Sequence, residues 1–194
     1  MVLEGWVSRY KVLQRGQRQI FSFHIPGDMP DLQSLHLKTM DHSVCAMTPV
    51  RVGFVPHGAI YEAMRQRAGL MIAFWRDTLI DAAVFREWMA GIGRRSAYQR
   101  IGHLFCELYL RLRSVGLTGE GGFQLLLTQT EIADALGLTS VHVNRVLKEL
   151  RNHGLIATPN RYVNILDWEG LQAAGDFDPT YLHLRPSTPD ESPL

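Results

Sequence analysis

The most regular pattern of apolar residues in this chain is a long run without proline, from Leu70 to about Arg94. Seven residues in it are spaced alternately four and three apart: Met71, Trp75, Thr78, Ala82, Phe85, Met89 and Ile92. Such a heptad seam predicts a helix that pairs with a second copy of itself. The alternative is a helix packed on its own β domain. Ile72, Phe74 and Leu79 form a second apolar stripe that can contact the β domain, so we favour self-pairing through the seam.

The chain before this helix, up to about Pro56, has the pattern of short β-strands. Apolar residues at positions 21, 23 and 25 alternate with Ser22 and His24, which is the period of a half-buried strand. Apolar positions 6, 10 and 12 share one parity, and residues 14–17 suit a hairpin connection. Two apolar runs follow, at residues 43–47 and 51–55. These strands predict a sandwich or a jelly roll, but they are too few to close a roll.

The last part of the chain, from about Arg95, combines helical and β patterns. Apolar residues with helical spacing mark one amphipathic helix: Ile101, Leu104, Phe105, Leu108, Tyr109 and Leu112. Gly116 is expected to end this helix, and residues 119–122 to form a loop. Residues 155–166 are predicted to form a short hairpin around Pro159 and Asn160. The end, residues 186–194, is rich in Pro and Ser and is expected to be flexible.

Residues 129–148 meet the local requirements of a helix-turn-helix. Thr128 and Glu131 have the spacing of a capping box, which satisfies free N–H groups at the start of a helix. Ala133 is small where the two helices cross, and Gly137 lies in the turn, where the backbone needs a residue that tolerates positive φ. Both helices have apolar residues for a buried face: Ile132, Leu136, Leu138, Val143, Val146 and Leu147.

The second helix of this motif is expected to begin at the N-cap Thr139, to end at Gly154 and to expose a polar face. We predict that Arg145 reads a base, because Arg can donate two hydrogen bonds to guanine. Asn144 can bind adenine in the same way, and Val141 can contact a thymine methyl group. Phosphate contacts are predicted for Thr128, Gln129, Ser140, His142 and Lys148. The alternative is a helical hairpin that binds a protein instead of DNA.

Over nearly its entire length the sequence resembles the bacterial Crp/Fnr family of transcription regulators. The residues that carry the resemblance are Leu127-Thr-Gln-Thr-Glu-Ile-Ala-Asp-Ala-Leu-Gly-Leu, Val143-Asn-Arg-Val-Leu-Lys and Gly154-Leu-Ile. Upstream, Phe21-Ser-Phe-His-Ile-Pro-Gly-Asp resembles the strand and loop before the family's effector pocket. The resemblance implies a cyclic-nucleotide-binding-like jelly roll, a long dimerisation helix and a winged helix-turn-helix, in the order of the patterns above.

The effector pocket departs from that of the family's cyclic-AMP-binding members. Those members have a Glu that binds the ribose and, further along, an Arg-Ser that binds the phosphate. The resemblance assigns Asp31, and His42 with Ser43, to these positions. Without the Arg, a phosphate lacks its bidentate partner, so cyclic AMP is not the expected effector. The sequence does not identify another small molecule.

Two further kinds of sensing are not supported by the residues present. Iron–sulfur-sensing members need four cysteine ligands, whereas this chain has only Cys45 and Cys106. Haem-sensing members use a His or Cys ligand, but His24, His36 and His42 are scattered and are predicted to be polar surface residues. We therefore expect no cofactor and no metal.

The front of the β domain and the recognition helix also differ from the family pattern. Members carry further strands before the position that matches residues 2–6, so the resemblance implies a roll that lacks its first strands. Either the sequence starts at an internal Met, or the roll is incomplete and has lost its sensing function; both alternatives stay open. The family usually has a Glu where this chain has Val141, so its operator is not expected base for base.

Composition and charge narrow the class of protein. A chain with 46% hydrophobic and 20% charged residues is an ordinary globular protein. Its net charge is +1, but residues 94–166 hold nine Lys and Arg against five Asp and Glu, a local excess of +4 that suits a DNA-binding face. No phosphate-binding loop, G-x-S-x-G elbow or H-E-x-x-H motif occurs, so we do not expect an enzyme. No signal peptide or membrane-spanning run is recognised, so a cytoplasmic location is expected.

The sequence therefore predicts an α+β protein in four parts. These are a partial effector domain at residues 1–66, a dimerisation helix at 67–94, a winged helix-turn-helix at 95–178 and a flexible tail at 179–194. The expected function is transcription regulation by a homodimer on a near-palindromic operator. The expected partners are double-stranded DNA, a second copy of the chain, RNA polymerase and an unidentified small-molecule effector, with no membrane.

Overall fold

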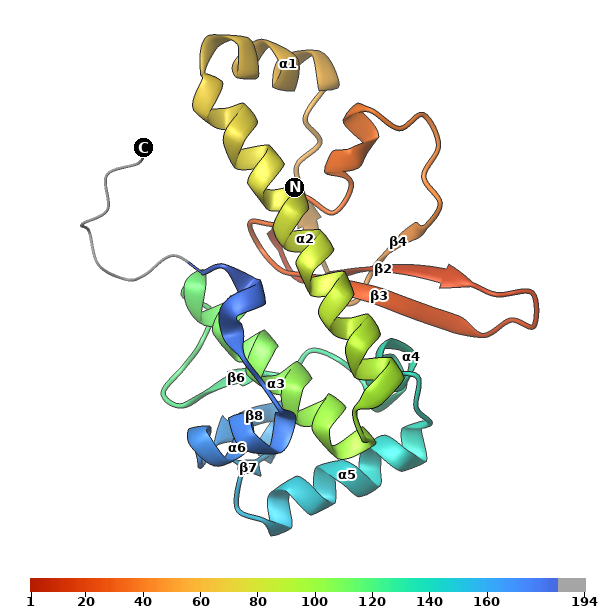
Figure 1. The fold of residues 1–194 in the computed structure, drawn as a ribbon, viewed down its shortest axis with the longest axis vertical. Coiled ribbons are helices and arrows are strands. Elements are labelled where there is room, and N and C mark those ends of the chain that lie inside the picture. Colours follow the sequence, from red (N-terminus) through yellow and green to blue (C-terminus); the bar gives the residue numbers. More distant parts are fainter. Residues whose placement is uncertain (185–194) are drawn as a thin grey trace.

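The structure, a computed structural model, describes residues 1–184 and contains six α-helices and eight short strands in that range (Figure 1). The long helix α2 (Ala68–Arg94) crosses the molecule, with the N-terminal strands on one side and the C-terminal helices around its far end. Mixed helices and small sheets in this order confirm the predicted α+β class. None of the described helices is long and apolar enough to cross a membrane.

The N-terminal part is built from two small antiparallel sheets. Its strands are β1 (Val2–Glu4), β2 (Val7–Val12), β3 (Arg18–His24), β4 (Ser43–Ala46) and β5 (Arg51–Val52). One sheet has the order β3-β2-β4, and β1 pairs with β5 in the other. The predicted hairpin connects β2 and β3, with Gly16 at φ +79° in its turn. The strand β5 is followed by a helix, α1 (His57–Gln66), where the sequence analysis predicted none.

The strand β3 does not keep the alternation that the sequence predicted. Ile20 and Phe23 are both fully buried, whereas Phe21 is half-buried. The register of the β2–β3 pair shifts between Arg9 and Tyr10, and such a bulge changes which side chains point inward. Ser22 and His24, predicted on the polar face, are buried instead. The face of the sheet that holds Ser22 and His24 is therefore buried, although the sequence pattern predicted that it would be exposed to solvent.

The helix α2 packs on the rest of the molecule mainly through its C-terminal half. Its buried residues are Ala83, Val84, Trp88 and Gly91. The ring of Trp88 lies edge-on to the ring of Phe23, with 5.7 Å between centroids. The second apolar stripe was predicted to contact the β domain, but Ile72 is 66% exposed and Leu79 is 52% exposed. That prediction was wrong because the apolar partners meet the helix further along, at residues 83–91.

The C-terminal part contains the remaining helices and a three-stranded sheet. Its elements are α3 (Ala97–Ser114), β6 (Gly122–Gln124), α4 (Gln129–Leu136), α5 (Ser140–Asn152), β7 (Ile156–Ala157), β8 (Tyr162–Ile165) and α6 (Trp168–Gly175). The strands have the order β6-β8-β7, so the predicted hairpin gains a third strand that begins at Gly122, within the predicted loop. The core of this part includes Phe105, Phe123, Ile132 and Leu150, all fully buried.

The helices α3 and α6 approach each other at a pair of glycines. A Cβ added at Gly175 would lie 2.5 Å from the backbone nitrogen of His103, and one added at Gly102 would lie 3.1 Å from the Cα of Gly175. The carbonyl of Gly175 also lies 3.2 Å from His103 Nδ1, within hydrogen-bond distance. Backbones that approach this closely leave no room for a side chain at Gly175.

Replacing Gly175 with alanine is therefore expected to lower the free energy of unfolding by about 2–3 kcal/mol, because the two backbones must separate. Urea unfolding followed by circular dichroism measures the loss. The matched control is Gly58→Ala in α1, where nothing lies within 4 Å of the added Cβ. It is expected to leave stability unchanged or raise it by about 0.5–1 kcal/mol. Equal stability of the two variants would contradict the close crossing.

The start of the predicted flexible tail is corrected by the structure. Residues Pro179–Leu182 form a 3₁₀ turn, η3, and Leu182 is only 3% exposed. The Tyr181 hydroxyl donates a hydrogen bond to the Glu107 carboxylate at 2.8 Å. Burial of these side chains orders this turn. The rest of the predicted tail, residues 185–194, lies outside the described residues.

Candidate DNA-binding surface and the polar network behind it

The helix-turn-helix is formed by α4 and α5, with the caps that the sequence predicted. Thr128 Oγ1 accepts a hydrogen bond from the Glu131 backbone N–H at 3.2 Å, and the Glu131 carboxylate accepts one from the Thr128 N–H at 2.7 Å. This capping box satisfies donors at the start of α4. Gly137 has φ +64°, in the left-handed region, and Thr139 caps α5 through its hydroxyl. Local chemistry thus sets the angle between the two helices.

The outward face of α5 holds the side chains predicted to contact DNA. Seven of the eight candidates on α5 and at the start of α4 are exposed: Thr128, Gln129, Ser140, Val141, Asn144, Arg145 and Lys148. His142 is half-buried. The apolar residues behind this face, Val143, Val146 and Leu147, are buried. The helix therefore presents one polar surface and is held rigidly from behind.

Two contacts link the candidate base-reading residues to their neighbours. Arg145 Nη2 lies 2.7 Å from His142 Nε2, and Asn144 Nδ2 donates to Gln129 Oε1 of α4 at 3.3 Å. Arg145 and Asn144 are thus each held by a residue that was predicted to bind phosphate. The sequence pattern identified these residues as candidates but did not predict that they contact one another.

The β2–β3 hairpin contacts the first helix of the helix-turn-helix directly. Arg18 Nε donates to the Asp134 carboxylate at 2.8 Å, and Gln19 donates to the carbonyl of Ala135 at 3.0 Å. Both contacts lie on α4, the helix that supports α5. The N-terminal sheet and the DNA-binding helices therefore meet without an intervening element.

The seam predicted on α2 is largely uncovered in the single chain. Met71 is 58% exposed, Trp75 68% and Met89 70%. Ile92 and Thr78 are also exposed, whereas Ala82 and Phe85 are half-buried. The Arg9 guanidinium lies over the Phe85 ring, 5.1 Å from its centroid. A row of large apolar side chains is thus left without a partner on one face of α2.

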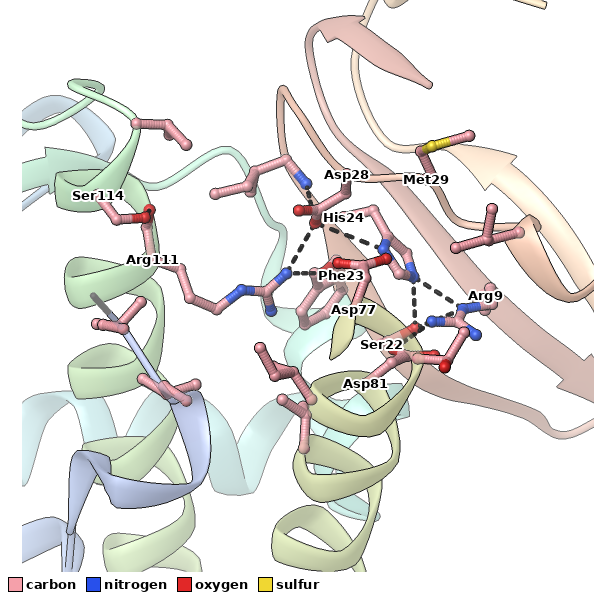
Figure 2. A pocket seen from close by; sticks show the side chains of 18 of the residues that line it. Arg9, Ser22, Phe23, His24, Asp28, Met29, Asp77, Asp81, Arg111 and Ser114 are labelled. Atoms are coloured by element: carbon pink, nitrogen blue, oxygen red, sulfur yellow. Dashed lines mark hydrogen bonds and ion pairs between the residues drawn. The ribbon is translucent and has the colours of Figure 1, made fainter. Parts of the chain in front are cut away.

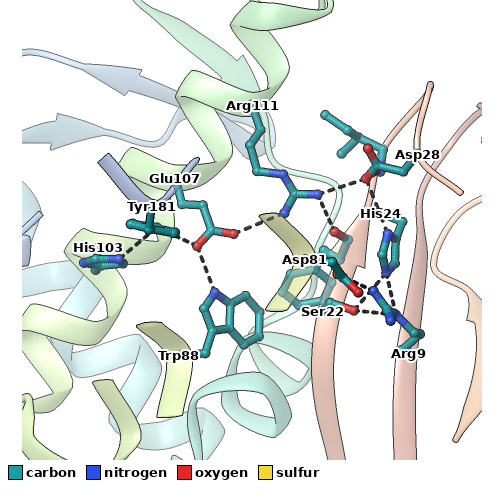
Figure 3. Close-up of polar contacts among 12 residues, drawn as sticks. Arg9, Ser22, His24, Asp28, Asp81, Trp88, His103, Glu107, Arg111 and Tyr181 are labelled. Carbon is teal, nitrogen blue, oxygen red and sulfur yellow. Dashed lines mark hydrogen bonds and ion pairs between the residues drawn. The ribbon is translucent and has the colours of Figure 1, made fainter. Parts of the chain in front are cut away.

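A chain of buried polar side chains connects the β domain, α2 and α3 (Figure 3). Arg111 of α3 is its junction: its guanidinium donates to Asp28 at 2.9 Å, to the carbonyl of Phe23 at 2.8 Å and to Glu107 at 3.1 Å. The Glu107 side chain is fully buried and also accepts from Trp88 Nε1 at 2.8 Å. The carboxylates of Asp28 and Glu107 thus flank the Arg111 guanidinium on two sides.

The network continues from Asp28 into the β sheet. His24 Nδ1 lies 3.4 Å from the Asp28 carboxylate, and His24 Nε2 accepts from Arg9 Nε at 2.8 Å. The side chain of Arg9 is 4% exposed and also pairs with Asp81 of α2. These contacts join residues far apart in the chain, so neither α2 nor α3 can shift against the sheet without breaking a charged hydrogen bond.

The pKa values follow from this burial and pairing. Burial lowers the pKa of His24, so its imidazole is held neutral, and burial opposes ionisation of Asp28. The charge of Arg111, together with the contacts from His24 and the Ile25 N–H, outweighs that penalty and holds the pKa of Asp28 below its ordinary value. For Asp77 burial raises the pKa, and the nearby charges of Asp28 and Asp81 raise it further.

Two cavities lie in the N-terminal part, and one of them adjoins the polar network. Figure 2 shows one of about 170 Å³, between the sheet, α2 and α3, where the side chains of Arg9, His24, Asp77 and Arg111 line its walls. The other, of about 360 Å³, lies among β1, β4 and β5 and has mostly apolar walls: Val2, Val7, Leu32, Leu35, Val44, Val52, Phe54 and Ile60. The larger cavity is the better candidate for an effector pocket because of its size.

Of the three effector-pocket candidates, only Asp31 lines the larger cavity. Most of the other lining residues are apolar, Ser34 and His57 are polar, and no Arg or Lys within residues 1–184 lines the cavity. His42 and Ser43 are not part of the cavity wall; His42 Nδ1 lies 3.0 Å from the Asp41 carboxylate. The structure therefore brings the three candidates to no common site, and their role stays a prediction.

The sequence analysis missed the polar network. The prediction of a polar surface position for His24 was wrong, because the side chain is buried and paired on both ring nitrogens. One signal was available: Glu107 and Arg111 are four residues apart within an apolar helical pattern, a spacing that allows an ion pair. Within residues 1–184, no three His, Cys, Asp or Glu side chains gather as metal ligands. Burial raises the pKa of the Cys106 thiol to about 12.

Comparison with known proteins gives consistent matches along the chain. Residues 1–67 match the family model of the cyclic nucleotide-binding domain, and residues 99–174 match that of the Crp-like helix-turn-helix domain. The chain is 32% identical over 175 residues to the nitrogen fixation regulation protein FixK of Bradyrhizobium diazoefficiens, covering 89% of this chain and 71% of the relative. FixK of Rhizobium meliloti is 31% identical over 175 residues, covering 89% and 75%.

Further matches agree in function and in fold. The transcriptional activator protein anr of Pseudomonas aeruginosa is 26% identical over 166 residues, covering 86% of this chain and 68% of the relative. The solved structure of FixK2 from Bradyrhizobium japonicum has the same fold, with a TM-score of 0.76 and 24% identity over 90% of this chain and 85% of that one. Identity, domain order and the geometry of α4 and α5 agree, and the chain belongs to the Crp/Fnr family of DNA-binding transcription regulators.

Proposed function

We propose that this regulator binds a near-palindromic operator as a homodimer that pairs through α2. The observation that carries the proposal is the polar face of α5, which is exposed and supported by a buried apolar face. Such a helix fits the major groove, and two copies related by a two-fold axis read half-sites about 34 Å apart. Acting in the cytoplasm, the bound dimer then recruits or blocks RNA polymerase.

The seam of α2 is the proposed contact between the two copies. Its Met71, Trp75 and Met89 leave more than half of their surface exposed in the single chain, and large apolar side chains at heptad spacing favour a partner helix of the same kind. A second copy of α2 supplies such a partner. The contacts of Arg111 with Glu107 and Asp28 involve none of the seam residues.

On this proposal, Arg145 reads a guanine, Asn144 an adenine and Val141 a thymine methyl group. Their positions on one exposed face of α5 support the assignment. Thr128, Gln129, Ser140, His142 and Lys148 surround them and are proposed to contact the phosphates, which fixes the register of the helix on the duplex.

Replacing Arg145 with alanine is expected to weaken binding to the operator by about 1–3 kcal/mol and to change binding to random DNA little, because a base contact discriminates between sequences. Fluorescence anisotropy with both duplexes at one salt concentration measures the two effects. Lys148→Ala is the matched control, since the loss of a phosphate contact weakens both duplexes about equally. Equal losses for Arg145→Ala would make Arg145 a phosphate contact only.

Effector gating is part of the same proposal. A cavity of about 360 Å³ is of the size that holds a small molecule, and Asp31 is the acidic residue on its wall. Among the residues that the structure describes, no Arg or Lys lines this cavity, so it lacks the bidentate partner that a phosphate takes in cyclic-AMP-binding sites. The proposed effector is therefore not cyclic AMP.

The experiment that tests the proposal is selection of bound sequences from a random DNA pool, with and without the small-molecule fraction of a cell extract. Enrichment of a palindrome with half-sites one helical turn apart supports the dimeric regulator, and dependence on the extract supports gating. Failure to enrich any sequence under both conditions would contradict specific DNA binding. In that case a salt titration decides whether the helical hairpin binds a protein, because phosphate contacts weaken steeply with salt.

A further inference from the structure

The smaller of the two cavities, of about 170 Å³, lies where the three parts of the chain meet (Figure 2). Its wall is formed by β2 and β3 of the sheet, by α2, and by α3 and the turn η3 of the DNA-binding part. The larger cavity takes no part of its wall from α2 or α3, so the two cavities are separate. A molecule in the smaller cavity would therefore contact the β domain, the long helix and the DNA-binding part at once.

The charged groups on the wall of this cavity do not balance. Arg9 pairs with Asp81 at 2.5 Å, and Arg111 pairs with Asp28 at 2.9 Å. The third carboxylate of the wall, that of Asp77, forms no hydrogen bond or ion pair with any residue that the structure describes. Burial and the charges of the other two carboxylates raise its pKa, as expected for an acid without a positive partner. Since burial holds the imidazole on the wall neutral, the wall carries one negative charge in excess.

The position of Asp77 makes this carboxylate available to a ligand. Asp77 is exposed, so a molecule from solvent can reach it at the open side of the cavity. A carboxylate among like charges costs stability in the free protein, and groups of this kind in a cleft are typical of functional sites. Within residues 1–184, no three His, Cys, Asp or Glu side chains gather as metal ligands, so a bare metal ion does not fit here. An ammonium or guanidinium group supplies the missing charge as a hydrogen-bond donor.

The rest of the wall determines what such a group is attached to. Buried apolar side chains form much of it: Phe23, Ile25, Leu32, Val84 and Leu182. Apolar surface is better covered by carbon than by water, so the site favours a cation with a hydrocarbon chain. The volume is smaller than that of the pockets that hold drug-sized ligands, so the chain must be short.

We propose that this cavity binds a small organic cation, whose ammonium or guanidinium group pairs with the Asp77 carboxylate and whose carbon chain lies against the buried apolar wall. The observation that carries the proposal is one unpaired carboxylate on the wall of a cavity whose other charged groups are paired. The site is separate from the DNA-reading face of α5 and from the larger cavity. Its test therefore requires no operator and does not depend on the proposed function.

The test uses the full chain and four probes that share one butyl-length carbon chain and differ in the head group: n-butylamine, butylguanidine, butyrate and butan-1-ol. Dissociation constants are measured by ligand-observed NMR titration at neutral pH and fixed salt. We expect at least one of the two cationic probes to bind in the millimolar range, as suits so small a ligand. Butyrate and butan-1-ol are expected to bind at least about tenfold more weakly, because neither brings a positive charge to Asp77. The comparison of the two cationic probes then shows which head group the site prefers.

Two variants locate the bound cation. Asp77→Asn keeps the shape of the side chain but removes its charge, so the cationic probes should bind about tenfold more weakly. Because Asp77 has no partner to lose, the free variant should melt at the same temperature as the unmodified protein or at a higher one. Asp31→Asn is the matched control: it removes the carboxylate of the larger cavity and should leave binding of the cationic probes unchanged.

Several results would overturn the proposal. These are a lack of binding by both cationic probes, binding of butyrate or butan-1-ol as tight as theirs, and unchanged affinity in Asp77→Asn. Loss of binding in Asp31→Asn would place the cation in the larger cavity instead. A lower melting temperature of free Asp77→Asn would show that this carboxylate already has a partner in the fold, which also contradicts the proposal.

Discussion

Replacing Arg111 with methionine is expected to lower the free energy of unfolding by about 3–5 kcal/mol. The guanidinium is the donor shared by Asp28, Glu107 and the Phe23 carbonyl. Without it the Glu107 carboxylate, whose side chain is fully buried, loses its positive partner. Removing one partner of a buried pair costs much more than the pair contributes, because the remaining charge stays desolvated.

Urea unfolding followed by tryptophan fluorescence measures this loss, since Trp88 bonds the same carboxylate. Arg113→Met is the control: Arg113 lies on the same helix but is exposed, so its change should stay within about 0.5 kcal/mol. The double variant Arg111→Met with Glu107→Gln removes the uncompensated charge and should recover part of the loss. A loss below about 1 kcal/mol for Arg111→Met would mean that the network contributes no more than an exposed ion pair.

Replacing Trp75 with glutamate is expected to convert the regulator into a monomer and to weaken operator binding by about 10²–10⁴-fold. The expected factor is large because the second half-site then no longer binds as part of one molecule. Trp75 is 68% exposed in the single chain, so a charge there should leave the fold of each copy intact. Phe85 is less suitable for this test, because it is half-buried beneath Arg9 and its loss would also disturb the polar network.

Sedimentation equilibrium measures the mass of the assembly, and anisotropy measures binding to the operator. Ala73→Glu is the matched control, since Ala73 is exposed on the same helix but lies outside the seam. It should remain dimeric and bind the operator normally. If Trp75→Glu stays dimeric, the heptad seam is not the dimer contact, and α2 serves only to pack against its own chain.

The elements that depend on nearby residues could be predicted from the sequence. The capping box of Thr128 and Glu131 and the left-handed Gly137 act within a few residues, so their spacing was enough to predict the helix-turn-helix. The helix α6 was missed although Asp167 caps it, accepting from the Gly170 N–H. Its apolar pattern is too short to distinguish it from a loop.

The polar network could not be predicted in this way, because its contacts between the β domain and the helices α2 and α3 join residues 72 or more positions apart. His24 has the same sequence context as a surface residue of a half-buried strand, and only the packing of α2 and α3 over the sheet buries it. Ile20 is also buried, although a strict alternation with Phe21 and Phe23 would point it outward, because the bulge at Arg9 and Tyr10 shifts the register of the strand. The burial of His24 and Ile20 is therefore determined by packing between distant parts of the chain, which the local sequence pattern does not contain.

The turn at Pro179–Leu182 has a consequence for the order in which the protein is completed during synthesis. The Tyr181 hydroxyl is one of the donors to the buried Glu107 carboxylate, and Leu182 is buried beside α2 and α3. A nascent chain that has reached α6 has made the whole helix-turn-helix but not this donor. The DNA-binding part can therefore close over its buried charge only after the ribosome has released residues 179–182. Completion of this core thus waits for the synthesis of residues 179–182.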